Sequence, residues 1–276
     1  GWTCEPFGIQ GLSWDTVEED IDPEIRKYLA KVDGERKLWH GVPLNTNLCY
    51  SNPKVRDIII KDIVSYAKEH PQIDVLQFWL ADGSNNQCEC EGCQKKRPSD
   101  FYVMMLNRLD ERLTEEELDV KIVFLIYVYL LWAPESERIK NPDRFILMFA
   151  PITRTYSSTF SADGELPAIP PYERNKLKFS SKVEDNLALL QSWQDIFDGD
   201  SFDFDYHFIV LLLFNRLFYV MLLDGYKRIF QRRKFMKLGF IISNYPGEKR
   251  VPLLPEDIKN FENEIVIEKG LGAEMG

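Results

Sequence analysis

Helical and strand patterns alternate along this 276-residue chain, and the alternation predicts an α/β fold in which helices cover parallel strands. No glycine-rich phosphate turn follows the first strand, which favours a (β/α) barrel over a dinucleotide-binding sheet. About five or six strands are convincing, whereas a closed barrel needs eight. We therefore expect a partial (β/α)8 TIM-type barrel, either a piece of a larger barrel or an interrupted one, followed by a short foreign C-terminal segment.

The first helix and strand are predicted between residues 52 and 80. Asn52 caps a helix that Pro53 opens, and His70-Pro71 ends it. Apolar side chains recur within it at helical spacing, at Val55, Ile59, Ile63 and Ala67. The run at 75–80 is short, aromatic and branched enough to be a buried strand.

The same alternation continues to residue 208. A second helix begins at Ser99 or Asp100 and extends through Leu113, and a strand rich in Ile, Val and Tyr covers 120–131. The remaining elements are a strand at 145–149, a loop rich in Pro and Ser at 151–181, a helix at 183–197 and a strand at 202–208.

Composition limits the function. With 45% hydrophobic and 28% charged residues, the chain can bury the core of one large domain. A formal net charge of -10 without a basic stripe argues against binding nucleic acid through its phosphates and favours neutral or cationic ligands. The apolar run at 209–223 contains Asn215 and Arg216 and is too short to span a membrane. The chain opens with Gly1 and carries no signal peptide, so we expect any targeting segment to be removed or to lie outside this sequence.

A polar loop at residues 81–93 is the strongest indication of a functional site. It follows the predicted strand at 75–80, and active sites of parallel α/β folds collect at the carboxyl ends of strands. Its cysteines, Cys88, Cys90 and Cys93, form a C-x-C-x-x-C pattern that can direct three thiolates at one zinc ion. Cys49 is a candidate fourth ligand and Cys4 is the other. Four thiolates leave no open coordination position, so the predicted metal is structural; reduced thiols that only line a tight turn are the alternative.

Two carboxylates are the candidate catalytic pair, because acid–base hydrolysis needs one acid and one nucleophile or base. Asp82 follows the strand at 75–80. Asp205 lies in the strand at 202–208, where alternation places it on one face with Asp203 and His207. An Asp-Gly pair also makes turns, and an Asp near a His also satisfies local hydrogen bonds, so a structural role is the alternative for both.

Candidate substrate-binding residues lie near the ends of other strands. Tyr127, Tyr129 and Trp132 can stack against the apolar face of a ring-shaped ligand, although core packing is the commoner use of such residues. Arg154 can hold a ligand carboxylate, with a structural ion pair as the alternative. His207 can bind a ligand hydroxyl or serve as a hydrogen-bonded wall residue.

Several of these segments, taken as an ordered set, resemble a known family. They are VDGER at 32–36, LCYSNP at 48–53, DG at 82–83 with the cysteine cluster, YVY at 127–129 and DYH at 205–207. The set resembles a family of bacterial glycoside-hydrolase-like barrels catalogued as a domain of unknown function, over residues 3–208. That family is similar in fold to α-glucuronidases and hexosaminidases. The resemblance implies a barrel that acts on or binds carbohydrate, and it implies a secreted or periplasmic location.

The C-terminal residues resemble a different family. From Met236 to residue 276 the sequence is similar to the amino terminus of alanine dehydrogenase-like enzymes, especially the carboxyethylornithine synthases, and Met236 resembles an original start codon. We therefore divide the chain into a barrel part at 1–208, an aberrant junction or linker at 209–235 and a fragment at 236–276. Our hypothesis is a gene-junction product. Residues 270–276 miss the G-x-G-x-x-G pattern by one residue, so no nucleotide cofactor is expected.

These observations predict a glycoside hydrolase-like protein that cleaves or binds polysaccharide-derived sugars, with uronic-acid-containing sugars among the candidates. A truncated barrel can be inactive, so the alternatives are a non-catalytic carbohydrate-binding barrel and a fragment of an alanine dehydrogenase-like oxidoreductase. Neither a membrane span nor a nucleic-acid partner is expected. The sequence leaves the oligomeric state open.

Overall fold

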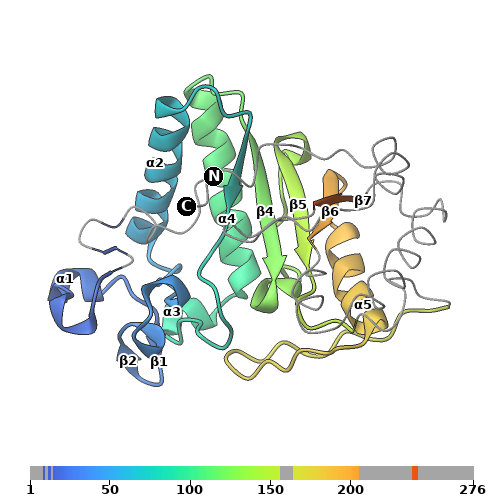
Figure 1. The fold of residues 1–276 in the computed structure, drawn as a ribbon, viewed down its shortest axis with the longest axis horizontal. Helices are drawn as coiled ribbons and strands as arrows, with labels where there is room; N and C mark the ends of the chain where they lie inside the picture. The colour runs from blue at the N-terminus through green and yellow to red at the C-terminus, as the bar shows by residue number, and fades with distance from the viewer. Residues whose placement is uncertain (1–8, 10–11, 14, 156–163, 205–237, 242–276) are drawn as a thin grey trace, which may run out of the picture.

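Parallel strands that lie side by side in chain order form the centre of the protein (Figure 1). The structure is a computed structural model and describes residues 9, 12–13, 15–155, 164–204 and 238–241. Its five-stranded sheet has the order β3-β4-β5-β6-β7, and every neighbouring pair is parallel. The sheet strands are β3 (Val75–Phe78), β4 (Lys121–Tyr127), β5 (Phe145–Ala150), β6 (Asp200–Phe204) and β7 (Leu238–Ile241). The predicted α/β class with a parallel sheet is confirmed.

Three long helices accompany the sheet, and short elements precede it. The long helices are α2 (Pro53–Glu69), α4 (Pro98–Glu115) and α5 (Val183–Gln194). The short ones are α1 (Pro23–Arg26), α3 (Glu91–Gln94) and the antiparallel hairpin of β1 (Lys31–Val32) and β2 (Glu35–Arg36). In Figure 1, α3 and the hairpin lie toward the end of the sheet at which the arrowheads of β4 and β5 point.

Helix α2 forms as the sequence predicts. The side chain of Asn52 accepts a hydrogen bond from the amide of Lys54 at 3.0 Å, and Pro53 occupies the first turn, where a missing N–H costs nothing. The buried side chains of α2 recur along one side of the helix: Val55, Ile59, Ile60, Ile63, Val64 and Ala67. This apolar side packs into the main core, which holds α2 beside α4.

The long helices share one face of the sheet. Phe78 of β3 and Phe124 of β4 are partners in the register, so their side chains point to the same side. On that side the ring of Tyr102 from α4 contacts both phenyl rings, with centroids at 5.3 and 6.3 Å. The indole of Trp193 from α5 lies 5.7 Å from the ring of Phe124. Among the described residues, the long helices thus lie on one face of the sheet. A (β/α) barrel also has its helices on one face, whereas a doubly wound sheet has them on both.

The other face of the sheet has its own, smaller apolar cluster. Its buried members are Val123, Leu125, Met148, Ala150 and Phe202. In a closed barrel this face fills the interior. The described residues form an open sheet of five strands, so the closed eight-stranded barrel is not confirmed.

Several predicted boundaries change. The strand expected over 120–131 ends at Tyr127, because Val128 has a positive φ of 41° and a 3-10 helix (Val128–Leu131) follows. Helix α5 ends at Gln194 instead of residue 197. Strand β6 begins at Asp200, and the predicted continuation to 208 lies outside the described residues. Strand β7 falls in the segment predicted to be a fragment and pairs with β6.

Within the described part of the chain, no helix has the length and apolar character needed to cross a membrane.

Candidate metal centre at the carboxyl end of the sheet

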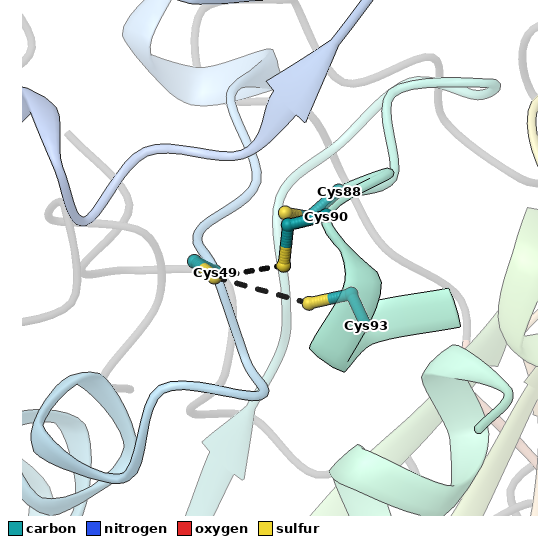
Figure 2. A group of neighbouring side chains, drawn as sticks. All are labelled: Cys49, Cys88, Cys90 and Cys93. Carbon is teal, nitrogen blue, oxygen red and sulfur yellow. Dashed lines mark hydrogen bonds between the residues drawn. The ribbon is translucent and has the colours of Figure 1, made fainter. Parts of the chain in front are cut away.

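Four cysteine side chains from two distant segments meet in one place (Figure 2). Cys49 lies in the segment before α2, where its amide donates to the carbonyl of Tyr28 at 2.7 Å. Cys88 lies in the loop after β3, Cys90 caps α3, and Cys93 lies within α3. The short helix therefore turns the last two thiols toward the same point as Cys88.

The spacing of the sulfur atoms matches a tetrahedral metal site. All four Sγ atoms lie within 4.8 Å of one another, with Cys49 Sγ 3.6 Å from Cys90 Sγ and 3.9 Å from Cys93 Sγ. Zinc–sulfur bonds of about 2.3 Å in a tetrahedron place the sulfurs about 3.8 Å apart. A disulfide needs about 2.05 Å, and all four of these cysteines are free. The residues present fit a structural Zn²⁺ with four thiolates.

Donor groups surround the thiols. The amide of Lys31 donates to Cys88 Sγ at 3.3 Å, and the amide of Ser51 donates to Cys93 Sγ at 3.4 Å. The Ser51 hydroxyl accepts from the Cys93 thiol at 3.2 Å and lies 3.5 Å from Cys90 Sγ, where it can donate. Such outer contacts orient ligands and stabilise negative charge on sulfur.

Two arginines supply positive charge. The guanidinium of Arg36 lies 3.8 Å from Cys49 Sγ. Burial opposes the charge on Arg36, but its hydrogen bond to Cys49 and the attraction of Cys49 and Cys88 raise its pKa. Arg174 donates to the carbonyls of Cys88 and Cys93 at 3.2 and 2.7 Å. Because Zn²⁺ with four thiolates is left with two negative charges, two nearby arginines are the expected compensation.

The crowded thiols have divergent pKa values. Hydrogen bonds from Cys88 and Cys93 hold the pKa of Cys49 below the usual range, which marks Cys49 as the first thiolate. The Cys88 pKa rises to about 11 because Cys88 hydrogen-bonds to Cys49, and the Cys93 pKa is raised for the same reason. Neighbouring thiolates would repel one another, and a bound divalent cation would remove that repulsion by favouring the thiolate form at every ligand.

The segment at 174–177 braces the cysteine loop from the side. Asn175 accepts a hydrogen bond from the amide of Gln87 and donates to the Gln87 carbonyl, both at 2.8 Å. Asn85 accepts from the amide of Leu177 at 2.9 Å. The loop is thus held by polar contacts from a segment more than 80 positions away in the sequence.

A buried amide network joins this loop to the strand ends. Asn47 donates to Asn86 at 2.9 Å and accepts from the hydroxyls of Tyr50 and Tyr129 at 2.9 and 3.2 Å. Asn86 donates to the carbonyls of Asn45 and Asp82 at 2.7 and 2.8 Å. These partners satisfy the buried amide groups, so the network fixes the geometry of the loop.

Asp82 lies at the carboxyl end of the sheet with its side chain exposed. Its Oδ1 accepts a hydrogen bond from the amide of Gly83 at 2.6 Å, and Gly83 has a φ of 84°, so the Asp-Gly pair does make a turn. The carboxylate nevertheless remains open to solvent. Asp205 and His207, like Cys4, lie outside the described residues. Asp203 is buried level with Phe149, on the face that the helices cover.

The other predicted binding residues are mostly buried. Tyr129 is 1% exposed and donates to the Ala81 carbonyl at 2.9 Å, and burial raises its pKa. Trp132 donates to the Pro170 carbonyl at 2.7 Å. Arg154 is 6% exposed and donates to the Thr155 carbonyl at 3.1 Å. Tyr127 is half-buried beside the smaller apolar cluster. The structure therefore gives Tyr129, Trp132 and Arg154 structural contacts. Of the three, Tyr129 is bonded next to Asp82, at the Ala81 carbonyl.

Sequence reasoning found the four thiols and missed what surrounds them. Ser51 sits in the LCYSNP segment, two positions after Cys49, and this proximity was an available signal. Arg36, Arg174 and Asn175 carried no comparable signal, because their contacts are made across tens of residues.

Comparison with known proteins gives one short, strong similarity and one broad one. The N(5)-(carboxyethyl)ornithine synthase of Lactococcus lactis subsp. lactis (strain IL1403) is 62% identical over 37 residues, 13% of this chain and 12% of that protein. The enzyme of the same name from Clostridium botulinum (strain Hall) is 63% identical over 41 residues, 15% of this chain and 13% of that protein. The match thus covers about an eighth of the length of these curated relatives. No solved structure matches the chain.

The broad similarity is to a family model described as a domain of unknown function (DUF4838), which matches residues 18–195. That range contains every helix from α1 to α5, strands β1 to β5 and the four clustered cysteines. Since the match covers more than half of the chain, the chain belongs to the DUF4838 family.

Proposed function

We propose that this chain is a glycoside hydrolase-like protein that cleaves or binds polysaccharide-derived sugars and carries a structural zinc ion at Cys49, Cys88, Cys90 and Cys93. The observation that carries the proposal is the polar loop after β3, which presents the exposed Asp82 at the carboxyl end of a parallel sheet. Chain-order strands with helices on one face are typical of barrels, whose active sites form at that end.

In this proposal zinc has a structural role and takes no part in the reaction. The four thiols fill a tetrahedral site, so the metal has no position left for a substrate or water. Its role is to hold the loop after β3 against the segment before α2. The buried amide network then transmits that support to Asp82, whose carbonyl accepts from Asn86.

Metal analysis of the purified chain tests the centre. We expect near-stoichiometric zinc by inductively coupled plasma mass spectrometry, and its loss from a Cys88→Ser, Cys90→Ser double variant. Cys49→Ser should also lose zinc, whereas Cys4→Ser should keep it, because Cys49 lies within ligand distance of the cluster. Folded, reduced protein without metal would overturn the zinc proposal.

Hydrolysis and binding assays test the carbohydrate function. A screen of polysaccharide-derived oligosaccharides should find a ligand, and Asp82→Asn should abolish its cleavage while leaving its binding within about threefold. The same result is expected for Asp205→Asn if the two carboxylates act as an acid and base pair. Binding without cleavage by the wild-type chain would assign the non-catalytic alternative. Absence of both would overturn the carbohydrate proposal.

The short similarity to N(5)-(carboxyethyl)ornithine synthase favours a second candidate, an oxidoreductase-like fragment. We propose that it corresponds to residues 236–276, as the resemblance from Met236 suggests. We rank it second because the match covers about an eighth of those enzymes. Formation of N(5)-(carboxyethyl)ornithine by the purified chain would reverse this ranking.

A further inference from the structure

A hollow of about 480 Å³ opens beside the cysteine loop. Its walls come from α3, from the residues that lead into α4 and from the segment at 172–174. This volume is within the range of small-molecule sites, which is about 300–1,000 Å³. None of the site residues predicted from the sequence lines it, although Arg174, which contacts the cysteine loop, does.

The lining of the hollow is rich in cations. Lys95, Lys96, Arg97 and Arg174 contribute positive charge, against the carboxylates of Glu89 and Glu135. The chain as a whole carries a formal net charge of -10, so a lining with more cations than anions runs against the overall charge.

The four cationic side chains differ in how strongly they are paired with carboxylates. Arg97 pairs with Glu135 at 2.7 Å, and Lys96 pairs with Glu137 at 2.7 Å. Lys95 meets only Glu91, at 3.3 Å, and both of these side chains are largely exposed, so this pair contributes little. Arg174 binds backbone carbonyls and forms no ion pair with a carboxylate in the described part of the chain. Lys95 therefore remains available to attract an anion, and Arg174 adds positive charge from a fixed position beside the cysteine centre.

The rest of the lining suits a hydroxyl-rich ligand. Tyr172 presents an aromatic ring, with the guanidinium of Arg97 above it at 5.8 Å. Gln94 adds a planar amide, whose nitrogen also donates to the Glu89 carbonyl at 2.7 Å. Glu89 adds a carboxylate, which accepts from Asn175 and from the amide of Asp33 and has lone pairs left for ligand hydroxyls. Aromatic faces together with such planar polar groups bind sugar rings through their apolar and polar surfaces.

We propose that this hollow binds an anionic sugar, meaning an oligosaccharide unit with a carboxylate or sulfate group. The inference rests on the proposed carbohydrate function and specifies its ligand class. In this proposal the acidic group of the sugar binds near Lys95 and Arg174, and not at the buried Arg154 as the sequence suggested. The zinc centre supports the site, because Arg174 is fixed by the carbonyls of Cys88 and Cys93 and Glu89 lies between two of the ligands.

Charge reversal with a matched control tests this site. Lys95→Glu places repulsion in the hollow, and Lys140→Glu is the control, since Lys140 also pairs with one glutamate at 3.3 Å and its side chain is 71% exposed against 69% for Lys95. Isothermal titration calorimetry of the zinc-loaded chain would use a galacturonate oligomer, a sulfated galactose oligomer and a neutral galactose oligomer. At low salt we expect Lys95→Glu to weaken binding of an anionic oligomer about fivefold to tenfold, and Lys140→Glu to change it less than twofold.

The three oligomers separate the outcomes. A Lys95-specific loss with the galacturonate or the sulfated oligomer supports the site and identifies the anionic group. Equal losses in both variants, or tight binding of the neutral oligomer unaffected by Lys95→Glu, overturn this site while the carbohydrate function stands. Failure of all three oligomers to bind overturns the anionic site, and the Asp82→Asn cleavage assay then decides the proposed function separately.

Discussion

At the residue scale, Gly92 shows how closely the cysteine loop packs against the segment that contains Cys49. A Cβ atom at this position would lie 2.7 Å from Ser51 Oγ and 3.0 Å from Ser51 Cβ. Real Cβ atoms are not found this close to other heavy atoms, so α3 can approach the Cys49 segment only because residue 92 has no side chain. Glycine therefore lets the Ser51 hydroxyl reach two of the thiols.

We expect Gly92→Ala to destabilise the folded chain by about 1–3 kcal/mol and to weaken zinc binding, because the added methyl pushes α3 away from Cys49. Urea unfolding and competitive zinc titration measure the two effects. Ser51→Gly removes both clashing atoms, so the double variant should lose less than the sum of the single changes. Strict additivity would show that the close contact is not the cause.

At the element scale, Asp100 joins the first turn of α4 to the strand-connecting segment at 133–137. Its Oδ1 accepts from the amides of Ser136 and Glu137 at 2.7 and 3.0 Å, and its Oδ2 accepts from the amide of Arg97 at 3.1 Å. Burial alone would raise the pKa of Asp100, but these hydrogen bonds outweigh it and lower the pKa. A carboxylate at a helix N-terminus is also favoured by the helix dipole.

This lowered pKa predicts a pH-dependent stability. Because the folded-state pKa lies below the unfolded value of about 3.9, the contribution of Asp100 is present above about pH 4 and is lost as the pH falls through the folded-state value. We expect Asp100→Asn to cost about 1–3 kcal/mol at pH 7 by urea unfolding, and the difference from wild type to shrink toward pH 3. The exposed Asp57→Asn in α2 is the control; a pH-independent cost at Asp100 would contradict the ionic explanation.

At the scale of the whole molecule, the cysteine centre joins the segments before α2 and after β3, and Arg174 adds a third. A metal that binds only the folded arrangement stabilises it by mass action. Zinc at about a thousand times its dissociation constant contributes about 4 kcal/mol.

We expect a strong chelator to lower the melting temperature of the zinc-loaded chain by about 10 °C, and added zinc to restore it. Differential scanning calorimetry measures the shift. The Cys88→Ser, Cys90→Ser variant should already melt at the lower temperature and show no response to chelator. An unchanged melting temperature in the wild type would mean that the metal does not support the fold.

The sequence predicted local structure better than long-range structure, for a physical reason. Asn52-Pro53 and the spacing from Val55 to Ala67 specify α2, because caps and apolar periodicity act within a few residues. The end of β4 depends on the backbone of Val128, where a β-branched residue with positive φ is held by its surroundings. No local sequence pattern predicts a β-branched residue with a positive φ.

For the candidate site too, local sequence patterns predicted some features, and others depend on long-range contacts. The C-x-C-x-x-C pattern and the position of Cys49 before α2 were enough to predict that these four thiols cluster. Arg174 and the hollow beside it depend on how the segment at 172–177 returns to the loop, which is decided by contacts such as those of Asn175 with Gln87. The burial of Tyr129 and Arg154 was equally invisible, because the same residue types serve in cores and in sites.

The join between Cys49 and Cys93 also has a mechanical consequence. These are the outermost of the four clustered cysteines, 44 positions apart, and the chain between them contains α2 and β3. With zinc bound to all four thiols, that stretch is closed on itself, and force applied at the two ends of the protein bypasses it. A molecule stretched in optical tweezers should therefore keep about 150 Å of its contour hidden until the zinc–sulfur bonds rupture.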